Sequence, residues 1–130
     1  MVIDTSAFVA ILTGEPEGAR FIECIEAADS LLSSAATFVE TSIVIESRYG
    51  AEGLRDLDLF LAKAGVDIVP VDSDQALVAR RAFGRFGKGR HRAGLNFGDC
   101  FSYALATTRA EPLLFKGDDF VHTDVGAALP

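Results

Sequence analysis

Short apolar runs alternate with helical patterns along almost the whole of this 130-residue sequence. Four runs have the apolar character of short buried strands, at residues 2–3, 31–34, 66–71 and 113–115. Residues 124–130 are expected to form either a short last strand or a tail. No linker rich in Pro, Gly or Ser divides the chain between the four runs. This alternation predicts an α/β fold in one domain, with a short, mostly parallel central sheet flanked by helices on both faces.

The helices themselves are predicted from apolar residues that recur at helical spacing. They are expected at residues 7–12, 16–29, 35–49, 51–63, 73–83 and 96–109, and Gly50 is expected to separate the third from the fourth. The third has apolar residues around much of its circumference, including Val39 and Ile43, so much of it is expected to be buried. Thr5 and Ser6 offer hydroxyl caps for the first helix. Pro70 places the third strand near an edge of the sheet or at a strand end.

Asp4 is placed at the point where the first strand stops and the first helix begins. In a parallel sheet the carboxyl ends of the strands form the edge at which α/β proteins build their sites. Asp4 is therefore a candidate site residue, although an Asp at this position can also serve only as a helix cap.

Three further acidic positions have both a structural and a functional interpretation. Glu40 has apolar neighbours on its helix, so it needs a hydrogen-bonding partner, an ion pair or a metal. Asp99 follows Asn96 by three residues, which is a capping-box spacing. The pair Asp118 and Asp119 follows the last strand and suits a turn.

Taken together, these acids are predicted to converge on one rim of the sheet. Carboxylates packed together repel one another and need a cation, and an all-oxygen ligand set suits Mg²⁺ or Mn²⁺. The two cysteines, Cys24 and Cys100, form neither a disulfide framework nor a zinc-binding cluster, and are expected to be buried free thiols.

Charge is distributed unevenly. The net charge is −7, yet half of the twelve Lys and Arg residues fall between Arg80 and Arg92, and no acid occurs between Asp74 and Asp99. A basic stripe on an acidic protein is consistent with a phosphate-facing surface, and equally with a solvated helix face that runs into a loop. No apolar run approaches the length of a membrane span, and no signal peptide precedes the first strand, so a cytoplasmic protein without a membrane partner is expected.

Four stretches resemble the signatures of PIN-domain ribonucleases, in order and with appropriate spacing, and the VapC toxins of bacterial toxin–antitoxin operons are the most similar members. The stretches are Val2-Ile3-Asp4-Thr5-Ser6-Ala7, Thr37-Phe38-Val39-Glu40, Gly98-Asp99-Cys100-Phe101 and Leu113 to Phe120. The resemblance implies a PIN-like domain over residues 1–130 and a metal site built from Asp4, Glu40, Asp99 and Asp119, with Asp118 in reserve.

The resemblance also implies an activity and partners. It implies an endoribonuclease that hydrolyses tRNA or ribosomal RNA and depends on Mg²⁺, or on Mn²⁺ in its place. It also implies that the protein forms a homodimer and is inhibited by a VapB-like antitoxin. In this interpretation Asp4 and Asp99 are the inner metal ligands. Ser6 would assist at the metal or phosphate, and Lys88, Arg90 and Arg92 would grip the RNA backbone.

One alternative comes from a different class of protein. A receiver-like signalling domain has about this length, the same alternation and an Mg²⁺-binding acidic pocket, with Asp72 as phosphoacceptor and Lys116 as its lysine. Against it, Asp4 stands alone after the first strand, and the receiver hypothesis gives no role to Glu40 or to the basic stripe.

Overall fold

The computed structural model describes residues 1–129 and contains one four-stranded parallel sheet. Its strands are β1 (Val2–Ile3), β2 (Leu31–Ser34), β3 (Val66–Val69) and β4 (Leu113–Leu114), in the spatial order β3-β2-β1-β4. The chain builds the sheet outward from β1 to β3 and then returns to the other side of β1 with β4. The predicted α/β class with a parallel sheet is therefore confirmed, and β3 lies at an edge, as Pro70 indicated.

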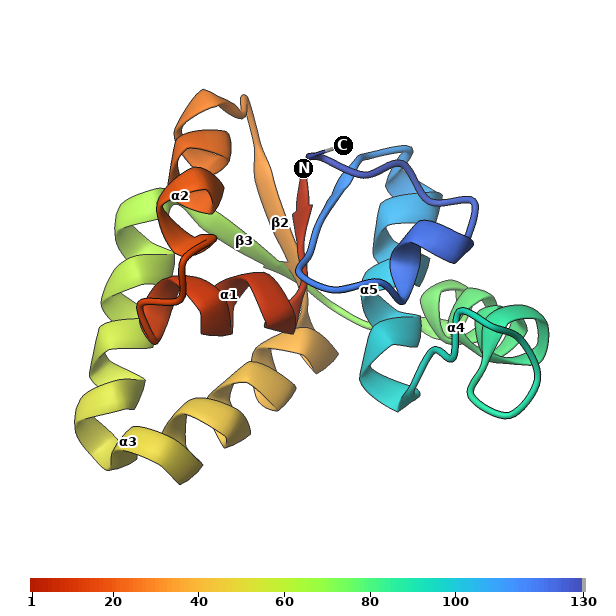
Figure 1. Ribbon diagram of the computed structural model, residues 1–130, viewed down its shortest axis with the longest axis horizontal. Coiled ribbons are helices and arrows are strands. Elements are labelled where there is room, and N and C mark those ends of the chain that lie inside the picture. The colour runs from red at the N-terminus through yellow and green to blue at the C-terminus, as the bar shows by residue number, and fades with distance from the viewer. Residues whose placement is uncertain (130) are drawn as a thin grey trace.

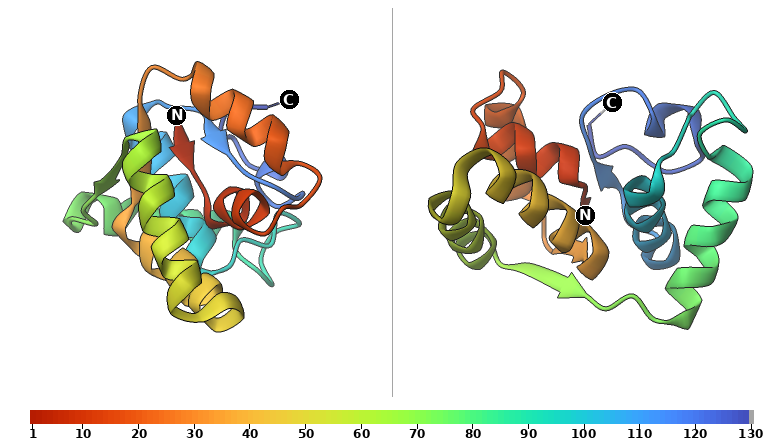
Figure 2. Two further views of the ribbon diagram at one scale, coloured as in Figure 1. Left: turned by 90° about the vertical axis from the view of Figure 1, so that its left-hand side faces the viewer. Right: turned by 90° about the horizontal axis from the view of Figure 1, so that it is seen from below.

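Helices cover both faces of this sheet (Figure 1). They are α1 (Thr5–Leu12), α2 (Gly18–Ala27), α3 (Ala35–Ala64), α4 (Ser73–Phe86) and α5 (Phe97–Arg109), with a short 3₁₀ turn, η1, at Phe120–His122. Figure 2 shows from below that α1 and α3 lie on one side of the sheet, and α4 and α5 on the other.

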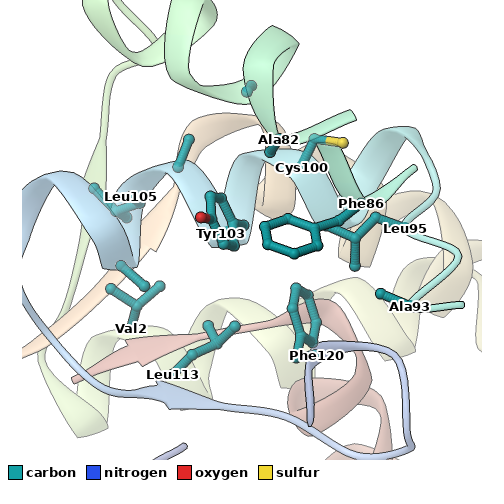
Figure 3. Close-up of a cluster of buried hydrophobic side chains, with 13 residues drawn as sticks. Val2, Ala82, Phe86, Ala93, Leu95, Cys100, Tyr103, Leu105, Leu113 and Phe120 are labelled. Carbon is teal, nitrogen blue, oxygen red and sulfur yellow. The ribbon is translucent and has the colours of Figure 1, made fainter. Parts of the chain in front are cut away.

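Neighbouring residues of β1 serve the two different cores, because successive side chains of a strand point to opposite faces. Val2 packs with residues of α4, α5 and β4, including Phe86, Tyr103 and Leu113 (Figure 3). Ile3 packs with residues of α1 and α2. Both side chains are completely buried, so the two-residue strand is fixed from both sides.

Gly50 divides α3 into two helical segments. Its φ of 64° and ψ of −152° lie outside the helical region, in a conformation that is accessible mainly to glycine. The break predicted between the two segments is therefore present. The outer face of the first segment differs from expectation, because Val39 and Ile43 are 54% and 61% exposed rather than buried.

Several helix ends differ from those predicted. The caps are Asp4 for α1 and Asp72 for α4, each of which accepts a backbone N–H, so Thr5 and Ser6 lie inside the first turn of α1 instead of capping it. Helix α4 continues to Phe86, three residues beyond its predicted end, and α2 begins at Gly18, two residues after Pro16.

The remaining expectations concern the tail and the cysteines. A final strand or tail was expected over 124–130, and Ala127 forms a single parallel bridge with Leu113, while Pro130 lies outside the described residues. Cys100 is a buried free thiol and Cys24 a half-buried one. Within residues 1–129, no helix is both long and apolar enough to cross a membrane.

Candidate functional site

Asp4 lies at the centre of the site, because β1 lies between β2 and β4 and the strand order reverses there. The Asp4 side chain is only 3% exposed. Its Oδ1 accepts a hydrogen bond from Ser102 Oγ at 2.5 Å, and its Oδ2 accepts from the Ser6 backbone N at 3.0 Å and from Ser6 Oγ at 2.7 Å. Three donors from two helices thus hold the orientation of this carboxylate.

Glu40 reaches the site from the first segment of α3. Its Oε1 accepts a hydrogen bond from Thr5 Oγ1 at 2.5 Å, and Thr5 Oγ1 in turn accepts from Thr41 Oγ1 at 3.1 Å. The Glu40 carboxylate lies directly against Gly98, at a place that a Cβ on Gly98 would occupy. Glu40 is therefore packed between α1 and the start of α5.

Asp99 enters from the first turn of α5, where the predicted capping box is present. Asn96 Oδ1 accepts from the Asp99 backbone N at 2.9 Å, and Asp99 Oδ2 accepts from the Asn96 backbone N at 3.0 Å. Its structural and functional interpretations are compatible, since the same carboxyl group also faces the pocket formed with Asp4 and Glu40.

Asp119 lines the same pocket as the other three acids, whereas Asp118 does not. Asp119 precedes η1, and its charge acts on the pKa of Asp99. Asp118 is exposed and is not among the residues that line the pocket. The geometry favours Asp119 as the fourth acid.

These acids surround an open pocket of about 490 Å³. It is lined by residues of α1, α3, the start of α5 and the segment after β4: Asp4, Thr5, Ser6, Val9, Glu15, Glu40, Val44, Arg48, Asn96, Asp99, Lys116, Gly117, Asp119 and Phe120. All four predicted acids therefore line the same pocket.

Burial and mutual repulsion raise the pKa values of two acids, Asp99 and Glu40. Partial burial, with the nearby charges of Asp4, Asp119 and Glu40, raises the pKa of Asp99 to about 7, against the lowering effect of the Asn96 backbone N–H. The pKa of Glu40 is raised by burial and by Asp4, against the lowering effect of its hydrogen bond from Thr5. The pocket therefore favours binding of a proton or of a metal cation.

The stability of the metal-free protein is expected to fall as pH rises from about 4 to about 7, because of Asp99. The raised pKa keeps the folded-state carboxyl protonated in this range, whereas an unfolded chain ionises its Asp residues near pH 4. The folded state binds more protons, so the free energy of unfolding decreases with rising pH. Thermal melting in EDTA across this range checks the expectation. Asp99→Asn should show a shallower fall, and an equally steep fall would contradict the assignment to Asp99.

The residues fit a hard divalent cation by their chemistry, although the side chains do not converge as metal ligands. Among residues 1–129, no three His, Cys, Asp or Glu side chains come together closely enough to hold a metal ion. Asp4, Glu40 and Asp99 instead accept hydrogen bonds from protein donors. All the candidate ligands are carboxylate oxygens, which suit Mg²⁺ or Mn²⁺. The pKa values of Glu40 and Asp99 are raised by burial and by neighbouring carboxylates, and a bound cation would offset both effects.

Several residues at the site were not predicted from the sequence. Ser102 and Thr41 act through hydrogen bonds, to Asp4 and to Thr5 respectively. Arg48 lines the pocket, and so does Lys116, which the sequence suggested only as the lysine of the receiver alternative. The Lys116 backbone N donates to Ser6 Oγ at 3.0 Å. Of these unpredicted residues, only Arg48 has a sequence spacing that indicates its place at the pocket. It lies eight residues after Glu40 and so shares its helix face.

Other predicted residues lie elsewhere. Lys88, Arg90 and Arg92 are exposed in the connection between α4 and α5, and none of them lines the acidic pocket. Asp72, the phosphoacceptor of the receiver alternative, is an exposed cap whose Oδ1 accepts from the Gln75 backbone N at 2.8 Å. Asp72 also lies outside the acidic pocket, so the geometry does not support a receiver site.

Comparison with known proteins gives a consistent result over the whole chain. Residues 1–126 match the PIN domain family. The chain is 57% identical over 131 residues to VapC ribonuclease Mb0640 of Mycobacterium bovis, covering 100% of both chains. It is 60% identical over 128 residues to a ribonuclease VapC of Mycolicibacterium smegmatis, covering 98% of each.

Solved structures share the fold. The crystal structure of Mycobacterium tuberculosis VapC20, described as a sarcin-ricin loop cleaving toxin, superposes with a TM-score of 0.78 and 16% identity over 95% of each chain. A toxin–antitoxin complex from Klebsiella pneumoniae gives a TM-score of 0.70 and 16% identity, covering 95% of this chain and 92% of that one. At this identity the likeness concerns the fold.

Proposed function

This chain belongs to the PIN-domain family and, within it, to the VapC ribonucleases, and from that premise we propose that it is a Mg²⁺-dependent endoribonuclease that hydrolyses tRNA or ribosomal RNA. The observation that carries the proposal is the buried carboxylate of Asp4, held by three donors and facing a pocket that Glu40, Asp99 and Asp119 also line. Such an acidic, all-oxygen pocket suits metal-assisted attack of water on a phosphodiester.

The acids would differ in how closely they bind the cation, because some are held more firmly than others. Asp4 and Asp99 would hold the cation most closely, because each is anchored at a helix start by backbone hydrogen bonds. Glu40 and Asp119 would complete the site, directly or through water. When bound, the cation supplies positive charge at the phosphate and acidifies the attacking water.

Water attack predicts the ends of the products. The P–O3′ bond breaks when water adds to phosphorus, so fragments with 5′-phosphate and 3′-hydroxyl ends are expected. End mapping of tRNA and ribosomal RNA after incubation with the protein and Mg²⁺ checks this, and EDTA should stop the cleavage. Fragments ending in 2′,3′-cyclic phosphate would contradict the mechanism, because the ribose 2′-hydroxyl would then be the nucleophile.

RNA outside the pocket would meet the loop residues predicted from the sequence. Lys88, Arg90 and Arg92 are exposed, and the Arg90 guanidinium lies 5.7 Å from the centre of the Phe83 ring. Ser6 lines the pocket, and its hydroxyl already donates to Asp4. The loop is therefore proposed to bind the backbone at a distance from the reacting phosphate.

A VapB-like antitoxin and a second copy of the chain are the proposed protein partners. VapC proteins are the toxins of toxin–antitoxin pairs, and the Klebsiella pneumoniae structure that shares this fold is such a complex. Exposed apolar side chains provide surface for these contacts, notably Val39 and Ile43 on α3 and Phe97 at the start of α5.

A further inference from the structure

Arg48 lies on the wall of the acidic pocket, on the same face of α3 as Glu40. Glu40, Val44 and Arg48 follow one another at intervals of four residues, and all three line the pocket. With a rise of about 1.5 Å per residue, Arg48 lies about 12 Å along the helix from Glu40. Arg48 therefore lines the pocket from a position about two helical turns beyond Glu40.

Arg48 is the cation of this pocket that remains available to a ligand. The other one, Lys116, is held by two carboxylates, with its Nζ 2.8 Å from Glu15 and 3.3 Å from Glu17. Arg48, by contrast, has no carboxylate oxygen within salt-bridge distance in the part of the chain that the structure describes. Its charge is therefore not compensated within the described fold.

A polyanion that enters this pocket meets a strongly negative surface. Five carboxylates line it, of which Glu15 pairs with Lys116, and one divalent cation would neutralise only part of the charge of the other four. A neighbouring phosphate of the RNA strand would need a cation of its own, and a guanidinium is suited to this because its planar fork binds phosphate oxygens in pairs. Lys88, Arg90 and Arg92 lie outside the pocket and cannot fill this role from their present positions.

We propose that Arg48 binds a phosphate of the RNA strand next to the one that is cleaved. This inference rests on the proposed RNA cleavage in the acidic pocket and adds a phosphodiester-binding position to it. Arg48 would then set how the strand lies across the carboxylates, and its loss would weaken substrate binding more than it slows the chemical step.

The test measures RNA binding separately from cleavage. Binding of a fluorescein-labelled, mixed-sequence single-stranded RNA is followed by anisotropy at several salt concentrations, with all variants made in an Asp4→Asn background to prevent cleavage. Arg48→Ala is expected to weaken binding about tenfold, since hydrogen bonds to charged groups are the strong ones. The slope of log affinity against log salt should become shallower by about 0.7.

Arg55→Ala is the matched control, since it removes the same charge from an exposed position on the second segment of α3, outside the acidic pocket. It should leave both affinity and salt slope nearly unchanged, and Arg48→Lys should recover part of the affinity. Equal losses for Arg48→Ala and Arg55→Ala would overturn the proposal, because the effect would then be one of net charge. So would unchanged RNA binding by Arg48→Ala with weakened binding of a polyglutamate peptide, which would assign Arg48 to a protein partner.

Steady-state cleavage by the single variants separates this proposal from the broader one. Arg48→Ala should raise KM with little change in kcat, and its melting temperature should match that of the wild type. If the wild type does not cleave RNA, the proposed function fails, whereas the anisotropy comparison still decides whether Arg48 binds a phosphodiester.

Discussion

Replacing Asp4 by asparagine is expected to abolish RNA cleavage and leave the fold intact. The loss should be about three orders of magnitude or more, as is usual when a central catalytic group is removed. Asparagine has the same shape and is an equally good helix cap, so α1 keeps its start. Its amide oxygen can accept from the Ser6 backbone N, and its amide nitrogen can donate to Ser102 Oγ, which is free to turn toward Thr37.

Initial rates of RNA cleavage and thermal melting test this expectation together, with growth arrest after induction as a cellular readout. Wild type should arrest growth, and Asp4→Asn should not. Asp118→Asn is the control, because Asp118 is a neighbouring acid that lies outside the pocket and should be dispensable. Full activity of Asp4→Asn, or equal losses for both variants, would remove the main support for a metal site at Asp4.

The sequence was sufficient to predict that Asp4, Asp99 and Asp119 lie at one pocket, because each lies next to a local signal. Asp4 ends a strand, Asn96 and Asp99 have capping-box spacing, and Asp119 follows a strand. Such signals depend on residues close together in the chain, and the parallel sheet then brings their positions to one edge.

The supporting contacts could not be predicted in this way. Ser102 meets Asp4 across 98 positions of sequence, and Thr5 meets Glu40 across 35. A Ser or Thr inside a helix has no spacing that identifies its partner. The expectation that Val39 and Ile43 are buried was wrong for a related reason. A pattern of apolar residues does not show which face of a helix lacks a neighbour in the fold.

The basic residues between Arg80 and Arg92 were predicted to form a phosphate-facing surface only because they cluster in the sequence. Clustering does not determine how far a residue lies from the acidic pocket. Helix α4 carries Arg80, Arg81 and Arg85, and Arg85 pairs with Asp124 at 3.1 Å. Arg48, by contrast, is isolated in the sequence but lines the pocket. To identify basic residues that line the pocket, clustering of charge along the chain was therefore a weaker guide than position on a helix face that already carried an acid.

Gly98→Ala is expected to reduce RNA cleavage nearly as much as Glu40→Gln, although Gly98 has no functional group. An added Cβ would coincide with the Glu40 carboxylate, which is the mobile end of a long side chain and would move away before the backbone does. Folding should not suffer, because alanine is a better helix former than glycine by about 0.5–1 kcal/mol. The melting temperature should therefore stay constant or rise while activity falls.

The control is Gly84→Ala in α4, where a Cβ enters open space and activity should be unchanged.

The decisive comparison is the double variant. If Gly98 acts only by leaving room for Glu40, Glu40→Gln combined with Gly98→Ala should be no slower than Glu40→Gln alone, because coupled changes are not additive. Two losses that multiply would show that Gly98 acts through another part of the site, and a fully active Gly98→Ala would show that Glu40 works equally well from a displaced position. Mg²⁺ titration by calorimetry separates these outcomes further, since displacement of Glu40 should weaken metal binding in Gly98→Ala and leave it unchanged in Gly84→Ala.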